Sequence, residues 1–319
     1  MQPQSIHLSS GNLIADRRFE WARDLEAKGD LSCAADLLVQ ALELAPDYAS
    51  AWFALGEVRE KLGDRDGAVA AFRQAAQADA QDRHGAALHL VRLGELPAAA
   101  MPAGYVRALF DGYASGFDQA LTEGLGYRAP ELLLHAVQAA HAGERMKFDS
   151  GLDLGCGTGL AGAALRPHCD WLVGVDLSPA MLAKARTKGL YDRLVEGEVL
   201  DFLAGEAAAK VRYHLILAAD VFVYLDDLAP VLTAAALVLA PSGLIAFSVE
   251  THNGDGVTLR ETLRYAHGAA HVRAALAAAK LSLGSLDSAA TRTEKGLAVP
   301  GLIVVAVNPA GTPRCRTTR

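Results

Sequence analysis

A glycine-rich segment, Asp153-Leu-Gly-Cys-Gly-Thr-Gly-Leu160, constrains the fold of this chain more than any other feature. It follows a short, mostly apolar run at residues 148–154 and precedes a stretch of helical character at residues 161–165. The pattern predicts a strand, a tight turn and the start of a helix. Glycine allows backbone angles and close approaches that a Cβ would block, and a helix N-terminus presents unpaired N–H groups. Such a turn can hold a polar, nucleotide-like group against the main chain.

The glycine spacing and a downstream carboxylate indicate the kind of nucleotide. In the dinucleotide-binding turn G-x-G-x-x-G/A, the last small residue lets the helix pack closely on the strand. Here that position holds Leu160, and Gly159 comes one residue early, which argues against NAD. The next apolar run, Trp171-Leu-Val-Gly-Val-Asp176, ends in a carboxylate at the tip of the neighbouring strand. A carboxylate there can accept hydrogen bonds from both hydroxyls of a ribose.

Several segments, in this order, resemble the motifs of class I S-adenosylmethionine-dependent methyltransferases. They are residues 153–159, residues 173–179, Val195-Glu-Gly-Glu198 and residues 215–224, with residues 243–250 resembling strand five of that family. The resemblance covers residues 102–308 and extends to bacterial methyltransferases that carry tetratricopeptide repeats. It implies S-adenosylmethionine as the cofactor.

The resemblance also implies a set of cofactor-binding residues at the carboxyl ends of the strands, where ligands of such sheets bind. Asp176 would bind the ribose, and Asp153 would contact the amino-acid portion through water or the turn backbone. Glu198 or the amide of Val199 would bind the adenine edge, with Asp201 as an alternative to Glu198. The full predicted set is Asp153, Gly155, Cys156, Gly157, Gly159, Asp176, Leu177, Glu198, Val199 and Asp220.

Candidates for the chemistry follow strands four and five. Methyl transfer is an in-line displacement, so alignment supplies most of the acceleration, and a base is needed only for an acceptor that holds its proton tightly. Asp220 and Tyr224 follow strand four, near the expected methyl position, and His252 after strand five is the candidate base. Upstream of the core fold, Tyr113 and Phe117 could cover the cofactor or could simply pack as part of an amphipathic helix.

Composition excludes several classes of function. The chain has 319 residues, of which 51% are hydrophobic, and this allows two domains with sizeable cores. No apolar run reaches the length of a membrane span, the N-terminus lacks a leader pattern, and the 4 cysteines have no metal-like spacing. The net charge is −7 without a basic stripe, which disfavours nucleic acid. We therefore predict a reduced, cytoplasmic protein with no metal, no membrane and no nucleic-acid partner.

The N-terminal residues contain an internal repeat. Gly29-Asp30 matches Gly63-Asp64, and Leu38 matches Phe72, at the spacing of about 34 residues that is typical of tetratricopeptide repeats. Because about three repeats are usually needed for independent stability, this module should lean on the second domain, dimerise or bind a partner. The first helix of each repeat would line a peptide groove, with Phe19, Arg23, Phe53, Glu57 and Glu60 projecting; the alternative is a stabilising appendage without a ligand.

These observations predict three parts: a helical repeat module at 1–96, a methyltransferase domain at 102–308 and a disordered tail at 309–319. The predicted fold is a doubly wound, Rossmann-like α/β sheet with an antiparallel closing hairpin, preceded by the all-α module. The predicted function is transfer of a methyl group to oxygen or nitrogen of a small or carrier-bound molecule. Two alternatives stay open, namely a protein methyltransferase that recruits its target through the repeats and a cofactor-binding scaffold without activity.

Overall fold

The computed structural model describes residues 7–119, 121, 124, 126–141, 146–294 and 296–309. Contacts between Cα atoms divide the chain into two compact units. The first runs to Tyr113 and includes residues 259–263, and the second comprises residues 114–258 and the chain from Arg264 onward. Except for Pro309, the predicted tail lies outside the described residues. The predicted domain borders at residues 96 and 102 stay a prediction.

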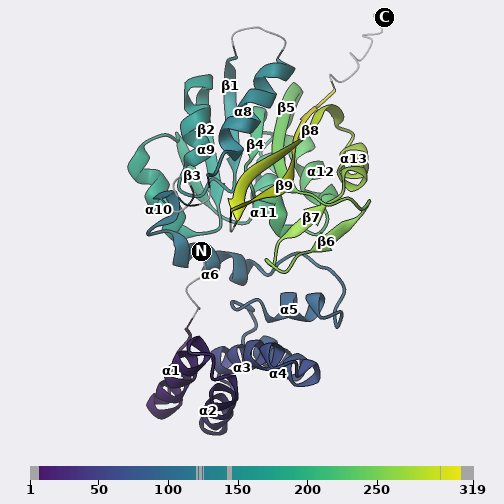
Figure 1. Ribbon diagram of the computed structural model, residues 1–319. Helices are drawn as coiled ribbons and strands as arrows, with labels where there is room; N and C mark the ends of the chain where they lie inside the picture. The colour runs from purple at the N-terminus through teal and green to yellow at the C-terminus, as the bar shows by residue number, and fades with distance from the viewer. Residues whose placement is uncertain are drawn as a thin grey trace, which may run out of the picture. The chain divides into compact units, whose positions relative to one another are not determined.

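The first unit is helical. Its helices are α1 (Leu13–Ala27), α2 (Leu31–Leu44), α3 (Ala49–Lys61), α4 (Arg65–Ala78), α5 (Ala86–Arg92) and α6 (Ala103–Tyr113). Helices α1 and α2 pair as one hairpin, and α3 and α4 pair as a second (Figure 1). The short α5 follows α4.

The two hairpins are built on the same turn. Gly29 and Gly63 adopt left-handed φ values of 84° and 80°, which end the first helix of each hairpin at little steric cost. The next residue caps the second helix. Asp30 accepts a hydrogen bond from the N–H of Cys33 at 3.2 Å, and Asp64 accepts one from the N–H of Gly67 at 2.9 Å. The repeat predicted from the sequence therefore corresponds to a repeated backbone geometry.

Close helix contact explains the small residues of this unit, and ion pairs explain its charged face. A Cβ on Gly56 would lie 2.5 Å from the ring of Phe72, so only glycine lets α3 and α4 approach this closely. On the face predicted to form a peptide groove, Arg23 pairs with Glu57 at 3.0 Å, and Glu60 pairs with Arg92. These side chains already satisfy one another, so this face is internally paired.

The second unit contains the sheet. Its strands are β1 (Phe148–Leu154), β2 (Cys169–Asp176), β3 (Arg193–Glu196), β4 (Tyr213–Ala218), β5 (Leu239–Glu250), β6 (Val257–Leu259), β7 (Tyr265–His267), β8 (Ser282–Glu294) and β9 (Leu297–Val307). The strand order is β3-β2-β1-β4-β5-β7-β6, with β9 pairing antiparallel to β5 and β8 pairing with β9. The strands from β3 to β5 are parallel, so their carboxyl ends share one edge.

Helices cover both faces of this sheet (Figure 1). One layer holds α8 (Ala129–Ala140) and α9 (Leu160–Leu165), and the other holds α11 (Val199–Ala208), α12 (Ala229–Val238) and α13 (Ala269–Ala278). Side chains alternate along a strand, so Leu215 and Leu217 join the first core and Ile216 joins the second. This explains why β4 is apolar throughout. Other elements of this unit are α7 (Phe117–Gln119), η2 (Arg166–His168), α10 (Pro179–Lys188) and η3 (Phe222–Tyr224).

The predicted α/β class and its closing antiparallel hairpin, β8 and β9, are confirmed. Strand β3 pairs with β2 from Val173↔Arg193 to Asp176↔Glu196. Helix α12 ends at Val238, and the next residue, Leu239, already begins β5.

No helix in the described part of the chain is both long and apolar enough to span a membrane. Within the same residues, no group of three or more His, Cys, Asp or Glu side chains is arranged to hold a metal ion.

Candidate active site

The turn between β1 and α9 has the backbone that its glycines predict. Gly155, Gly157 and Gly159 have φ values of 62°, 53° and 91°, a region that L side chains avoid. A Cβ on Gly155 would lie 2.5 Å from Cγ2 of Val221, so glycine is also needed for packing. At Gly157 the position of a Cβ has, among the described residues, only Cε1 of Phe117 nearby, at 3.9 Å. One side of the turn is therefore accessible to a ligand.

Asp176 ties this turn to the end of β2. Its Oδ2 accepts a hydrogen bond from the N–H of Gly157 at 2.8 Å, and its Oδ1 accepts one from the N–H of Ser178 at 2.8 Å. These two bonds fix the orientation of the carboxylate at the tip of β2, beside the glycine turn. The two predicted features of the site, the glycine turn and the strand-tip carboxylate, are thus in direct contact.

Asp153 is the buried acid of the site. Its side chain is 0% exposed, and Oδ2 accepts a hydrogen bond from the hydroxyl of Tyr191 at 2.7 Å. Its Oδ1 is buried and has no hydrogen-bond partner among the described residues. Burial raises the pKa of Asp153 to about 7; the charge of Asp176 adds to this, and the bond from Tyr191 opposes it. A buried acceptor without a donor is costly unless a ligand supplies one.

Tyr191 is a site residue that the sequence motifs did not indicate. A Cβ on Gly162 would overlap its phenol, and a Cβ on Gly174 would lie 2.9 Å from its ring. The only hint of this in the sequence is the pair of glycines itself, Gly162 in α9 and Gly174 in β2. Both lack a side chain where the bulky ring of Tyr191 packs. Tyr191 fills that space and holds Asp153 in place.

The other predicted cofactor residues occupy varied environments. Cys156 is buried, its N–H donates to the carbonyl of Val175 at 2.9 Å, and burial raises the pKa of its thiol, so the thiol is not activated. Leu177 is half-buried after β2. Glu198 is exposed directly before α11, and Val199 is the first residue of that helix. Asp201, the alternative to Glu198, is exposed in the first turn of α11.

The short helix α7 lies against the glycine turn. Phe117 is beside Gly157, and the carboxylate of Asp118 accepts a hydrogen bond from the hydroxyl of Thr158 and pairs with Lys188 Nζ at 2.7 Å. Of the two aromatic residues proposed as a cover, Phe117 therefore lies at the turn. Tyr113 ends α6 and belongs to the first unit.

Asp220, after β4, is held by several donors. Its Oδ1 accepts from the hydroxyl of Ser248 at 2.7 Å, and its own N–H donates to the Oγ of Ser248 at 2.8 Å. Its Oδ2 accepts from Arg292 at 3.2 Å and from Thr291 at 3.4 Å. The backbone of Asp220 has a positive φ of 55°, which these contacts stabilise. Its carboxylate is therefore committed to fixing the loop that leads to Tyr224, which is buried in η3.

Arg292, from β8, is the hub of a buried ion-pair cluster. Its Nη1 pairs with Asp220, its Nη2 with Glu250 and its Nε with Glu294 at 3.0 Å. Arg264 contacts the same acids, at 3.3 Å from Glu294 and 3.7 Å from Glu250. The sequence did not indicate this cluster, because nothing in the spacing of β8 marks its arginine, Arg292, as buried.

The prediction that His252 acts as a base is not supported by its position. Its Nδ1 accepts a hydrogen bond from the N–H of Gly254 at 3.0 Å, and its Nε2 bonds the carbonyl of Gly256 at 3.0 Å. Because Nδ1 accepts and Nε2 donates, both ring nitrogens are occupied by the backbone of its own loop. In this arrangement the imidazole has no free nitrogen to take a proton from an acceptor, and its two hydrogen bonds hold the loop after β5.

Comparison with known proteins agrees with this geometry. Residues 152–245, which contain the turn, Asp176, Glu198 and Asp220, match the family described as "Methyltransferase domain". Methyltransferase-like protein 27 of Homo sapiens is 43% identical over 86 residues, which cover 27% of this chain and 34% of that protein. Nodulation protein S of Sinorhizobium fredii is 29% identical over 102 residues, which cover 30% of this chain and 45% of that protein.

The chain thus matches less than half the length of these curated relatives. Among solved structures, it is similar to an S-adenosylmethionine-dependent methyltransferase from Clostridium acetobutylicum, with 17% identity and a TM-score of 0.47. That similarity covers 63% of this chain and 99% of the other. The predicted enzyme class, a methyltransferase, is confirmed for the residues that hold the site, and S-adenosylmethionine is the cofactor that the sequence motifs predict for it.

The site fits this cofactor on its own geometry. The unpartnered Oδ1 of Asp153 suits a cationic donor, and the open side of Gly157 leaves main chain accessible. Asp176 lies at the tip of β2 in contact with the turn, and the exposed Glu198 follows the next strand, β3.

Proposed function

We propose that this protein is an S-adenosylmethionine-dependent methyltransferase that acts on oxygen or nitrogen of a small or carrier-bound molecule. The observation that carries the proposal is the glycine turn tied to Asp176 beside the unsatisfied Oδ1 of Asp153. In this arrangement Asp176 binds the ribose, Asp153 faces the amino-acid portion, and Glu198 or the amide of Val199 binds the adenine. When bound, the cofactor supplies an electrophilic methyl group.

The residues after β4 and β5 support catalysis by positioning. Asp220 is held by Ser248 and Arg292, and His252 is held by its own loop, so neither is free to take a proton. An acceptor that is already ionised, or an amine with a free lone pair, needs only alignment with the methyl group. We therefore propose such an acceptor, with Tyr224 on the acceptor side of the site.

We further propose that the N-terminal hairpins are tetratricopeptide-like repeats. The support is the shared turn at Gly29 and Gly63, each followed by an aspartate that caps the next helix. Incubating cell extract with radiolabelled S-adenosylmethionine separates two acceptor classes: label in small molecules supports the main proposal, and label in protein supports recruitment of a protein target.

Cofactor binding is tested by calorimetry with S-adenosylhomocysteine and, separately, NAD. We expect S-adenosylhomocysteine to bind and NAD not to bind. Asp176→Ala should weaken binding by roughly ten- to 150-fold, since charge-assisted hydrogen bonds are worth about 1.5–3 kcal/mol. The matched control is Asp192→Ala, because Asp192 also accepts from a backbone N–H, that of Leu172 at 2.6 Å, but precedes β3 instead of following a strand.

Micromolar binding of NAD without binding of S-adenosylhomocysteine would contradict the proposed function. Equal affinity of Asp176→Ala and the wild-type protein would contradict only the role given to Asp176.

A further inference from the structure

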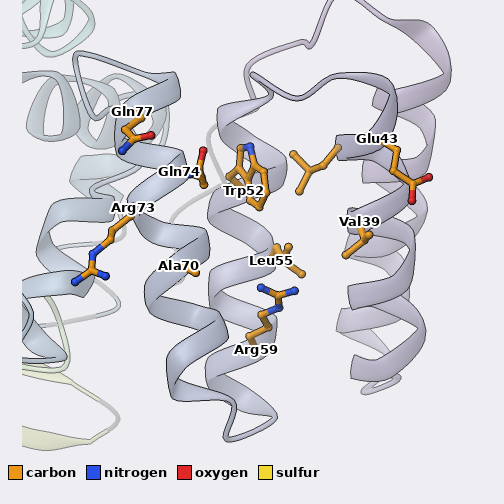
Figure 2. Close-up of a pocket in the computed structure, with 10 residues that line it drawn as sticks. Val39, Glu43, Trp52, Leu55, Arg59, Ala70, Arg73, Gln74 and Gln77 are labelled. Carbon is orange, nitrogen blue, oxygen red and sulfur yellow. The ribbon is translucent and has the colours of Figure 1, made fainter.

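A groove of about 820 Å³ lies on the helical unit between α2 and α4, with α3 along its floor (Figure 2). This is not the internally paired face of Arg23 and Glu57, because its lining comes from other positions of α3. The apolar lining includes Leu55, which is buried, and Val39, which is 38% exposed. The indole of Trp52 is anchored by its N–H, which donates to the carbonyl of Pro46 at 2.7 Å. The centre of the groove is thus apolar, while Glu43, Arg59, Arg73, Gln74 and Gln77 supply its polar lining.

Charges of opposite sign lie at the two ends of this groove. Figure 2 shows Glu43 near the level of Trp52 and Arg59 at the other end of α3. Glu43 is exposed, and its side chain has no hydrogen-bond or ion-pair partner among residues 7–113. Along α2 and α3 the order is therefore anion, apolar surface, cation. Arg59 also donates to the carbonyl of Gly67 at 3.1 Å, and the second cation of the lining, Arg73 on α4, pairs with Glu95 at 2.7 Å.

Helix α1 carries the complementary pattern on its exposed side. Ile14 is 59% exposed and Trp21 is 60% exposed, and residues seven apart lie on one face of a helix. Arg17 lies between them and Asp24 follows, and both are exposed. Neither side chain has a hydrogen-bond or ion-pair partner in the described part of this unit. The order on α1 is therefore cation, apolar residue, anion.

The two patterns match in length as well as in sign. On α1, the charges of Arg17 and Asp24 are seven residues apart, which is about two turns, or about 10.5 Å at 1.5 Å per residue. In the groove, Glu43 lies near the level of Trp52, and Trp52 and Arg59 are also seven residues apart on α3. We propose that α1 of one copy of this chain docks in the groove of a second copy. Arg17 then faces Glu43, Trp21 fills the apolar centre beside Val39, and Asp24 faces Arg59.

The contact joins two different surfaces, so a pair of copies closes when each provides α1 to the other. Such a dimer also covers the apolar stripe of α1, which no third repeat covers within the described residues. The inference concerns the helical unit alone and does not depend on the proposed enzymatic function.

Sedimentation equilibrium of the full chain tests this proposal. The expected mass rises with concentration from the 33.5 kDa of a single chain toward a dimer. Trp21→Glu and Val39→Glu should each prevent the rise. The matched control is Leu297→Glu, since Leu297 is a 74% exposed apolar residue of β9 in the other unit.

A charge swap tests the orientation. Arg17→Glu and Glu43→Arg should each weaken association by about tenfold or more, and the double variant should restore it, as expected of a close interfacial charge pair. Both residues are exposed, so neither change threatens folding. A mass of 33.5 kDa up to roughly 100 µM, where even weak contacts populate dimers, would overturn the proposal. So would wild-type association of Trp21→Glu and Val39→Glu, or failure of the double variant to recover.

Discussion

The glycine turn and the Arg292 cluster lie at the same edge of the same sheet, but they are held together by different physics. The turn is fixed by backbone: three positive φ values and an N–H of Gly157 that donates to Asp176. The cluster is fixed by side chains, since Arg292 joins Asp220, Glu250 and Glu294 from separate elements. The two meet at Val221, which follows Asp220 and packs against Gly155.

This difference predicts which kind of substitution destabilises the glycine turn and which kind destabilises the Arg292 cluster. A backbone-fixed turn fails when a Cβ is added, because the new atom meets strain or a neighbour. A charge-fixed cluster fails when one member is removed, because its partners are left buried and uncompensated. The expected experiments therefore differ in size and in kind.

The largest effect is expected for Arg292→Met. The change keeps much of the aliphatic volume and leaves Asp220 and Glu250 without their buried cation, which costs about 3–5 kcal/mol in the free energy of unfolding. Urea denaturation measures this cost. A second change, Asp220→Asn, should recover part of it, because it removes one of the uncompensated charges.

Lys147→Met is the control for loss of an ion pair as such. Lys147 pairs with Asp170 at 2.6 Å, but both side chains are at least half exposed. An exposed pair is worth about 0–1 kcal/mol, so Lys147→Met should change the free energy of unfolding by no more than this amount. Equal costs for Arg292→Met and Lys147→Met would remove the distinction between the buried cluster and an ordinary surface pair.

A smaller effect is expected for Gly155→Ala compared with Gly189→Ala. Both glycines have a φ of 62°, but a Cβ on Gly189 meets nothing within 4 Å, whereas one on Gly155 meets Val221. Both variants carry the left-handed strain, and Gly155→Ala should lose about 1–3 kcal/mol more through overpacking. Thermal or urea denaturation of the pair measures the difference. Adding Val221→Ala to Gly155→Ala should remove most of it; an unchanged difference would show that Val221 is not the obstacle.

The smallest effect is expected for His252→Ala. The change removes two hydrogen bonds in a partly exposed loop, which is worth about 1 kcal/mol of stability, and should leave affinity for S-adenosylhomocysteine unchanged. Denaturation and calorimetry on the same variant test both statements. A general base would instead lower turnover about a hundredfold or more, and that result would restore the original prediction for His252.

The same contrast explains how far the sequence could predict this molecule. Gly155, Gly157 and Asp176 were predictable because their role depends on backbone angles and strand ends, which spacing encodes. The repeated turn at Gly29 and Gly63 follows from a local pattern in the same way, whereas the closing hairpin was expected only from the resemblance to the methyltransferase family. Arg292, Tyr191 and the loop bonds of His252 depend on which side chains meet after distant strands assemble. A single sequence does not contain that information in its spacing.

Because Asp153 is buried, its carboxyl group keeps a proton to a higher pH than an exposed aspartate does. Its pKa is raised from 3.8 to about 7, so the folded protein holds this proton more tightly than the unfolded chain does. The contribution to stability is therefore greatest at low pH and is lost as pH rises through about 7. A cation bound at Oδ1 favours the ionised form and releases that proton to the solvent. Ligand affinity then rises over the pH range in which the free fold weakens, and the measured heat of binding depends on the ionisation enthalpy of the buffer.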